Sequence, residues 1–590
     1  MISVRAPVLA WLPAARTERR RFLVNAVRVS CCLVAAVLAW SAQASPARAQ
    51  AVEDADATRR HQQVDAIFAP WSGADTPGCA VGISRDGVLD YARGYGVSNL
   101  EYDVPITPES IFHVASISKQ FTAFSILLLA HEGKLSLDDD IRKYLPELPD
   151  YGKTITIAHL LHHTSGLREQ GQLLNLAGWR SDDLSTQADM LWAVTRQRKL
   201  NFDPGSEVVY GNAGYTLLAL VVKQVTGQSL RAFADERIFR PLGMSDTHFH
   251  VDHSEIVKRR TSAYRPGDKG GWRVSIPNYD HYGSTSLFTS VGDLLKWQDN
   301  LIRPRAGATA VMASMLTSGT LNDGRSIGYG GGVMLSTYRG LRTIEHDGVD
   351  AGYRADALTF PDQRLNIAVL CNGASIEPQE LAQRIAEVYL GDRMGPKLVP
   401  AVEAPMATLQ ALAGTYWSPL TDEVVRVEMK DGALRQVGVK TAFVPIGKDV
   451  FRPGESTHEW RFRRSADGRH ALSILDFWPT ARSFERVSAP MPTPAALASF
   501  AGQYRSDEVD MTYAVRLADG KLTMRWSRQK ETALEAVGGD RFISDMLGTV
   551  TFTRTATGEV NGLMISNRRL RRLHAERLAT SGASAQADGP

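Results

Sequence analysis

The sequence predicts a mixed α/β chain in which a long N-terminal region of helices and strands precedes two small antiparallel β-barrels. Three observations carry this prediction. Apolar helices accompany the polar motifs at Ser116–Lys119 and Tyr210–Asn212, β-like runs flank His346–Gly348, and the last third of the chain repeats itself in short alternating runs. At 590 residues, the chain is long enough for several domains.

The first motif lies in FHVASISKQFTAFSILLLAHEG, which places Ser116 and Lys119 one turn apart at a helix start. Residues i and i+3 share a helix face, so the Lys119 amine can reach the Ser116 hydroxyl. A partly dehydrated lysine has a lowered pKa and can take the proton of a serine. On this common pattern alone, however, an ordinary surface helix is the simpler interpretation.

The second and third motifs follow downstream. Tyr210–Asn212 occupies a turn before an apolar helix, where a phenol can relay a proton and an amide can hold a substrate carbonyl. His346–Gly348 lies between two β-like runs, and Gly348 allows backbone to approach a ligand closely. Each triplet alone fits a structural role, but the three motifs together indicate acyl-transfer chemistry.

With these motifs the chain resembles the serine β-lactamase and penicillin-recognising hydrolase superfamily. Tyr-x-Asn with His-x-Gly is similar to the branch of class C-type enzymes, DD-peptidases, D-aminopeptidases and esterases. The phrases PGCAVGISRDG, LSLDDDIRKYLPELP, HLLHHTSGL and HDGVDAGY extend the resemblance over roughly Gln63 to Leu390. It implies a β-lactamase-like α/β (α+β) fold, with an antiparallel sheet flanked by helices, a helical lobe, and Ser116 at their junction.

The resemblance also implies roles for the motif residues. Ser116 is the expected nucleophile, while Lys119 and Tyr210 share its proton transfers, and which of the two is the base stays open. The other expected roles are substrate binding by Asn212, His346 and Gly348, and an oxyanion hole formed by the backbone N–H groups of Ser116 and Val349. No metal or organic cofactor is required.

The substrate depends on the orientation of Asp347. The cation and hydroxyl of Lys-Thr-Gly enzymes suit a substrate carboxylate, whereas an acid that faces the ligand favours an amine.

The predicted function is a serine peptidase acting on D-amino-acid peptides, D-aminopeptidase-like or DD-peptidase-like. The alternatives are a broad-specificity carboxylesterase or β-lactamase-like hydrolase, and a non-catalytic penicillin-binding sensor. A small peptide or ester is the expected partner, and the net charge of +3 gives no indication of nucleic acid. The sequence does not indicate an oligomeric state.

Two further residue groups have alternative interpretations. His159, His162 and His163 have a spacing that suits a metal, but no carboxylate motif accompanies them, so packing histidines are favoured.

Cys79 and Cys371 cannot form a disulfide framework or a zinc cage. The resemblance implies that their strands are antiparallel neighbours, with α-carbons within about 7 Å. Either a disulfide or two buried thiols fit this placement.

Residues 1–50 predict a signal peptide, of the Sec or twin-arginine type, and therefore a periplasmic or secreted protein. A basic run at Arg16–Arg21 precedes an apolar core at Val29–Trp40 and two small-x-small sites. The core is shorter than the ~20 residues that span a bilayer, so no stable membrane anchor is expected.

The C-terminal third contains an internal repeat. LQALAGTYWSPL at Leu409 recurs as LASFAGQYRSDE at Leu497, and both copies alternate apolar and polar residues around Asp-Gly turns, as antiparallel hairpins do. The predicted organisation is a signal peptide at 1–50, a hydrolase domain at 51–394, a Pro-rich linker at 395–407, barrel repeats at 408–489 and 490–578, and a disordered tail at 579–590.

A hydrolase followed by two lipocalin-like barrels is similar to the arrangement of bacterial D-aminopeptidases. That resemblance implies a barrel loop that overhangs the cleft, restricts access to short substrates and contacts their free amine. The simpler interpretation is that the barrels pack against the catalytic domain and shield it. Because all motif residues precede the linker, the hydrolase domain is expected to fold without the barrels.

Overall fold

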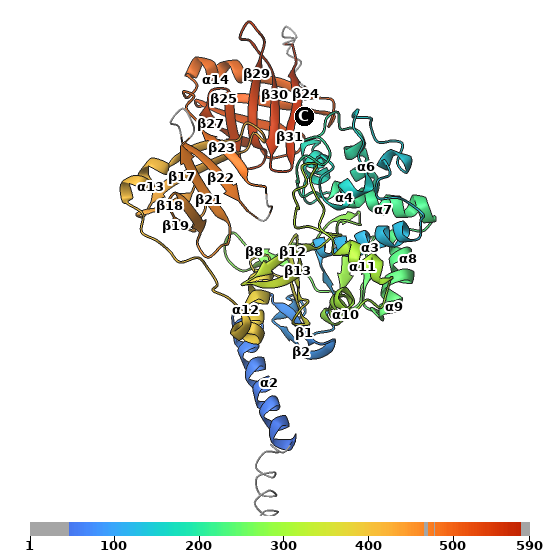
Figure 1. Ribbon diagram of the computed structural model, residues 1–590. Coiled ribbons are helices and arrows are strands. Elements are labelled where there is room, and N and C mark those ends of the chain that lie inside the picture. The colour runs from blue at the N-terminus through green and yellow to red at the C-terminus, as the bar shows by residue number, and fades with distance from the viewer. Residues whose placement is uncertain (1–45, 465–469, 477, 479, 580–590) are drawn as a thin grey trace, which may run out of the picture. The chain divides into compact units, whose positions relative to one another are not determined.

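The computed structural model describes residues 46–464, 470–476, 478 and 480–579 (Figure 1). The predicted signal peptide and tail therefore lie almost entirely outside the described residues. The chain divides into two compact units, Met1–Ala66 and Ile67–Pro590. The described part of the first unit is helix α2 (Pro46–Phe68) up to Ala66. Among the described residues, no helix has the length and apolar character needed to cross a membrane.

The second unit begins with a six-stranded antiparallel sheet in the order β12-β13-β14-β15-β1-β2. Its strands are β1 (Cys79–Arg85), β2 (Val88–Tyr95), β12 (Met334–Tyr338), β13 (Leu341–Asp350), β14 (Tyr353–Phe360) and β15 (Leu365–Cys371). Helices α10 (Val291–Ile302) and α12 (Pro378–Leu390) pack on it, which explains why β15 is buried along its whole length. Cys79 and Cys371 face each other across β1 and β15 and form a disulfide, with α-carbons 4.0 Å apart. The expected neighbouring strands are confirmed.

The chain segments between β2 and β12 form a helical lobe. Its helices are α3 (Ser118–His131), α4 (Ile157–Leu161), α5 (Gln170–Leu176), α6 (Gln187–Thr195), α7 (Ala213–Thr226), α8 (Leu230–Ala234), α9 (Arg240–Leu242) and α11 (Thr309–Met315). Short strands join them: β3 (Val97–Asn99), β4 (Val104–Pro105), β5 (Phe112–His113), β6 (Ser185–Thr186), β7 (His248–Phe249), β8 (Tyr264–Pro266), β9 (Trp272–Val274), β10 (Tyr279–Asp280) and β11 (Leu287–Thr289). Helix α3 is buried from Ser118 to Leu129 and lies at the centre of the main hydrophobic core, between α7, α8 and α11.

Two eight-stranded antiparallel barrels form the C-terminal region, as the repeat predicts. Barrel 1 comprises β16 (Gly414–Trp417), β17 (Val424–Lys430), β18 (Ala433–Gln436), β19 (Phe443–Gly447), β20 (Val450–Pro453), β21 (Glu459–Arg464), β22 (His470–Leu475) and β23 (Arg482–Arg486). Barrel 2 comprises β24 (Gly502–Ser506), β25 (Met511–Ala518), β26 (Lys521–Trp526), β27 (Thr532–Gly538), β28 (Arg541–Ser544), β29 (Gly548–Arg554), β30 (Val560–Asn567) and β31 (Leu570–Arg577). Barrel 2 is closed, while a single bridge between Arg435 and Ala442 nearly closes barrel 1.

The two barrels differ in what their apolar side chains pack against. Barrel 1 has its own core, which includes Phe462 and Phe484. The barrel 2 core continues into α5 and α6 of the helical lobe, where it takes in Leu173, Leu176 and Met190. A buried ion pair between Arg168 and Glu508 and two hydrogen bonds from barrel 2 rings to α5 carbonyls reinforce this interface. The helical lobe shares this core with barrel 2, which argues against the expectation that the hydrolase domain folds without that barrel. A truncated chain would test this expectation.

Candidate active site

The first two motif residues are in contact at the junction of the sheet and the helical lobe. Ser116 lies in a 3₁₀ turn (Ala115–Ile117) directly before α3, and Lys119 is in the first turn of that helix. The Lys119 Nζ atom donates to Ser116 Oγ at 3.0 Å, to the side-chain oxygen of Asn212 at 2.8 Å and to the Ser284 carbonyl at 2.8 Å. Burial lowers the pKa of this fully buried amine to about 7, so much of it is neutral at neutral pH and can accept a proton.

Tyr210 and Asn212 reach the same point from the turn before α7. The Lys119 ammonium lies 4.9 Å from the centroid of the Tyr210 ring. Burial raises the pKa of Tyr210 far above its ordinary value, and its interaction with Ser116 offsets only part of that rise. The phenol therefore stays protonated, so of the two candidates left open by the sequence, Lys119 has the pKa of a base.

Glu169, at the N-cap of α5, belongs to the site although no sequence motif marks it. Its carboxylate accepts a hydrogen bond from the Asn212 backbone N–H at 2.6 Å and another from the Asn212 side-chain amide at 3.1 Å. Asn212 is thereby held with its oxygen toward Lys119. The charge of Glu169 is also the strongest influence that raises the pKa of Lys119 against the effect of burial.

The third motif packs β13 against the 3₁₀ turn that carries Ser116. A Cβ at Gly348 would lie 2.3 Å from the Val114 carbonyl, so only glycine permits this approach. His346 was expected to line the wall of the site, but its side chain lies beneath it. His346 is 1% exposed, its ring nitrogens meet the Tyr329 hydroxyl at 3.1 Å and the Asp347 carbonyl at 2.7 Å, and burial lowers its pKa to about 4.

The residues of β13 that line the active-site cavity are those on the other face of the strand, Thr343, Glu345, Asp347 and Val349. The Asp347 side chain is 41% exposed there, and its charge raises the pKa of both Lys119 and Tyr210. The orientation that the sequence left open is therefore toward the cavity of Ser116. A carboxylate in this position disfavours a substrate anion and favours a cation.

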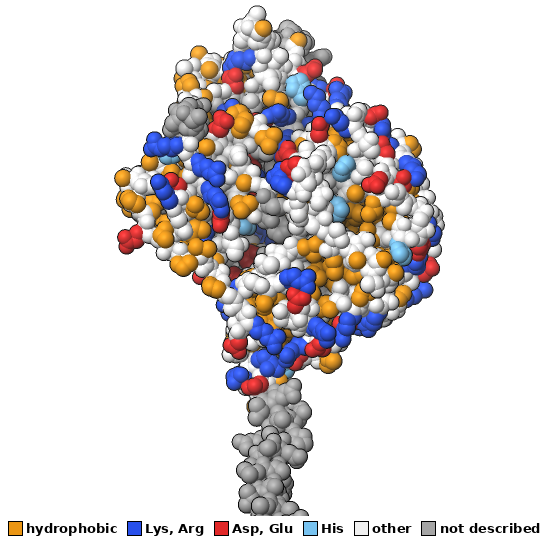
Figure 2. All heavy atoms as spheres, viewed as in Figure 1, with side chains coloured by type: hydrophobic (Ala, Val, Ile, Leu, Met, Phe, Trp, Pro, Cys, Tyr) orange, Lys and Arg blue, Asp and Glu red, His pale blue; other side chains and the backbone are white. Residues whose placement is uncertain are grey.

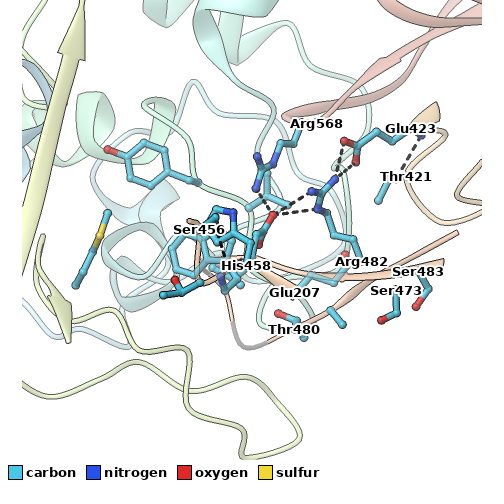
Figure 3. A pocket seen from close by; sticks show the side chains of 18 of the residues that line it. Glu207, Thr421, Glu423, Ser456, His458, Ser473, Thr480, Arg482, Ser483 and Arg568 are labelled. Carbon is cyan, nitrogen blue, oxygen red and sulfur yellow. Dashed lines mark hydrogen bonds and ion pairs between the residues drawn. The ribbon is translucent and has the colours of Figure 1, made fainter. Parts of the chain in front are cut away.

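The cavity has a volume of about 1640 Å³ and extends from Ser116 to barrel 1. Figure 3 shows its barrel 1 side, where Arg482 is held between Glu423 and Asp476. Basic side chains gather over β21 and β22 on the face seen in Figure 2, and Arg461 and Arg463 of β21 line the cavity. The catalytic motifs thus lie at one end of a space that is large enough for more than a single amino acid.

Barrel 2 contributes a residue next to the catalytic motifs. The guanidinium of Arg569, in the turn between β30 and β31, lies 5.1 Å from the centroid of the Tyr210 ring. Arg569 lines the same cavity as Ser116, and its charge lowers the pKa of Lys119. A barrel loop does reach the site, as the resemblance implied. Arg569 does not suit the expected contact with a free amine, because a cation repels an ammonium group.

The three clustered histidines occupy separate environments. The His159 ring accepts a hydrogen bond from the Thr156 N–H at 3.2 Å in a helix cap, and the His163 ring packs 4.4 Å from that of Tyr210. Packing histidines fit these contacts better than metal ligands do. Within the described ranges, metal-compatible groupings occur instead at His248, His250 and Glu255, and at Asp252, His253 and Asp280, outside the residues that line the cavity.

Two protein families match regions of the chain. The model of the Beta-lactamase family matches residues 58–390, more than half of the chain, and that of a domain of unknown function (DUF3471) matches residues 486–577 in barrel 2. The chain is 27% identical over 480 residues to a D-aminopeptidase of Gluconobacter oxydans, covering 80% of this chain and 86% of that protein. It is 29% identical over 305 residues to penicillin-binding protein 4* of Bacillus subtilis, covering 49% and 66%.

Among solved structures, the octameric penicillin-binding protein homologue from Pyrococcus abyssi aligns with a TM-score of 0.52 at 22% identity, covering 80% of this chain and 99% of that one. SurE aligns with the same TM-score and identity over 74% of this chain and 100% of its own. These similarities support the fold, a β-lactamase-like domain with additional C-terminal strands. The chain belongs to the beta-lactamase family and is a serine hydrolase of that family.

Proposed function

We propose that the protein is an exported peptidase that cleaves short D-amino-acid peptides through an acyl-enzyme on Ser116. The observation that carries the proposal is the contact between Ser116 Oγ and a fully buried Lys119 amine whose pKa is about 7. Export rests on the N-terminal sequence, with its basic run and short apolar core.

The proposed reaction uses two proton transfers. Neutral Lys119 takes the proton of Ser116 as Oγ attacks the substrate carbonyl, and the backbone N–H groups of Ser116 and Val349 stabilise the oxyanion. The leaving amine then receives a proton from Lys119 through the protonated Tyr210 phenol, and the C–N bond breaks. Water attacks the acyl-enzyme with Lys119 as base again, which releases the acid and restores the Ser116 hydroxyl.

The proposed substrate class rests on Asp347 and on the relatives. Asp347 presents a half-exposed carboxylate to the cavity that contains Ser116, which suits the free α-ammonium group of a peptide. Two D-aminopeptidases, from Gluconobacter oxydans and Brucella anthropi, match 80% and 74% of the chain at 27% and 26% identity. Together these observations favour an aminopeptidase over a carboxylate-selective enzyme or a β-lactamase.

The test is a hydrolysis panel of D-alanyl and L-alanyl p-nitroanilides, N-acetyl-D-alanyl p-nitroanilide, acyl-D-Ala-D-Ala, a short-chain ester and a cephalosporin. We expect the highest kcat/KM with the free-amine D-anilide and no turnover by Ser116→Ala. Asp347→Asn should reduce kcat/KM for the free amine about 10- to 100-fold more than for its N-acetyl analogue, as expected for loss of a charge-assisted contact.

Other outcomes of this panel would identify the alternative functions. Preference for the ester with no peptide hydrolysis would indicate a broad esterase, and efficient cephalosporin turnover would indicate a β-lactamase. Covalent labelling of Ser116 without release of product would indicate a penicillin-binding sensor. Equal effects of Asp347→Asn on the free and acetylated anilides would remove the amine-binding role of Asp347.

A further inference from the structure

The turn between β30 and β31 contains Arg569, whose charge has no counterion among the residues that the structure describes. Three neighbouring arginines are paired with acids: Arg568 with Asp476 at 2.6 Å, Arg571 with Glu207 at 2.9 Å, and Arg572 with Asp422 at 3.2 Å. The Arg569 guanidinium has no ion pair or hydrogen bond among the described residues, yet it is the one that lies over the Tyr210 ring. Its charge is therefore available to a ligand in the cavity that contains Ser116.

The backbone of Arg569 is fixed by the N-terminal domain. Its carbonyl accepts hydrogen bonds from the Glu169 N–H at 3.2 Å and from the Asn201 side-chain amide at 3.0 Å. Its own N–H donates to the Asn567 side chain at 3.0 Å. Glu169 also holds Asn212, so one residue positions both the barrel turn and the second catalytic motif. An anchored residue of this kind is preorganised for binding.

We propose that Arg569 binds a carboxylate of the substrate, so that barrel 2 supplies half of the recognition of a short zwitterionic peptide. A guanidinium stacked on an aromatic ring keeps its N–H edge free, and that edge matches a carboxylate with two parallel hydrogen bonds. Asp347 would hold the ammonium end and Arg569 the carboxylate of the leaving amino acid. The inference rests on the proposed peptidase function, because it assigns the second charged end of the same substrate.

The test measures competition against hydrolysis of a neutral chromogenic ester by the full-length protein. Inhibition constants are determined for N-acetyl-D-alanine and for its uncharged amide, N-acetyl-D-alaninamide. The wild-type protein should bind the carboxylate about 10- to 100-fold more tightly than the amide, the range of a charge-assisted hydrogen-bond pair. Arg569→Gln should bring this ratio close to one, and Arg569→Lys should keep part of it. Arg568→Gln, the matched control, removes a neighbouring paired charge and should keep the wild-type ratio.

Three results would overturn the proposal: no carboxylate preference in the wild-type protein, a preserved ratio in Arg569→Gln, or an equal loss in Arg568→Gln. Arg569→Lys, compared by circular dichroism, provides the ratio if Arg569→Gln does not fold. Failure of the peptidase function is distinguishable, because the ester reports the Ser116 chemistry whether or not D-peptides are cleaved. The wild-type protein could hydrolyse the ester but cleave no D-peptide, while Arg569→Gln still abolishes the carboxylate preference. In that case the anion site at Arg569 is supported, and only the peptidase assignment is wrong.

Discussion

The two C-terminal barrels share one architecture but have different relations to the active site. In each barrel a tyrosine of the first strand, Tyr416 or Tyr504, donates to the carbonyl four residues earlier, at 2.8 and 2.7 Å. Opposite that tyrosine, barrel 1 has Val425, whereas barrel 2 has Tyr513, which donates to the Leu176 carbonyl of α5. The repeat thus encodes a barrel twice, and a few substitutions in the second copy attach it to the catalytic domain.

The last two strands of each barrel also differ in how they relate to the active site. Both barrels present an arginine to the cavity near the connection of their final two strands: Arg482 is the first residue of β23, and Arg569 lies in the turn between β30 and β31. Arg482 of barrel 1 is neutralised by Glu423 and Asp476, whereas Arg569 of barrel 2 lies beside Tyr210 without an ion pair to any described residue. We conclude that barrel 2 contributes a cation beside the catalytic motifs. Barrel 1 contributes an aromatic ring instead, because the Trp478 ring lies 5.9 Å from that of Tyr329, which packs near Tyr210. The following predictions test that distinction.

The largest effect is expected from removing barrel 2. A chain that ends at Ala489 would expose the apolar faces of α5 and α6, including Leu173 and Met190, which are buried against barrel 2. We expect this truncated protein to aggregate or to lack cooperative unfolding, and to show no labelling by a fluorophosphonate. Circular dichroism, gel filtration and labelling provide the measurements. A folded monomer that labels at the wild-type rate would show that barrel 2 is dispensable.

The next effect compares two ion pairs of barrel 2, one to the catalytic domain and one to barrel 1. Arg168 and Glu508 are 2% and 8% exposed, while Arg426 and Glu535 are 30% and 60% exposed. Glu508→Ala leaves a buried arginine unpaired and should reduce the free energy of unfolding by about 3 to 5 kcal/mol. Glu535→Ala should cost about 0 to 1 kcal/mol. Urea denaturation of both variants measures the difference, and similar losses would contradict the unequal roles of the interfaces.

A smaller effect concerns the pH dependence set by Glu169. Neutral Lys119 is the reactive form, so acylation by a neutral ester should rise with pH through about 7. The charge of Glu169 raises the pKa of Lys119, so Glu169→Gln should move the midpoint of this rise in acylation rate, the acid limb of the pH profile, to lower pH. Glutamine keeps a hydrogen-bond acceptor for Asn212, which limits the structural disturbance. A shift to higher pH in stopped-flow acylation profiles would contradict the role given to Glu169.

The sequence predicted those features of the fold and the site that depend on residues close together in the chain. Ser116 and Lys119 meet because i and i+3 share a helix face, and the alternating hairpins predicted the barrels. The contributions of Glu169 and Arg569 were not predictable, because each lies in a segment without a motif and reaches the site only through tertiary packing. The burial of His346 was also missed, since the sequence pattern of a strand does not say which face meets the core.

The most direct test of the account is the pH profile of ester acylation in Arg569→Gln and Arg482→Gln, two variants that remove one cavity arginine each. The Arg569 charge lowers the pKa of Lys119, so its loss should raise that pKa and move the acid limb to higher pH. Arg482 is neutralised within barrel 1, so its loss should leave the limb at the wild-type position. An unshifted profile in Arg569→Gln, or equal shifts in the two variants, would contradict the claim that barrel 2 supplies the cavity arginine that acts on Lys119.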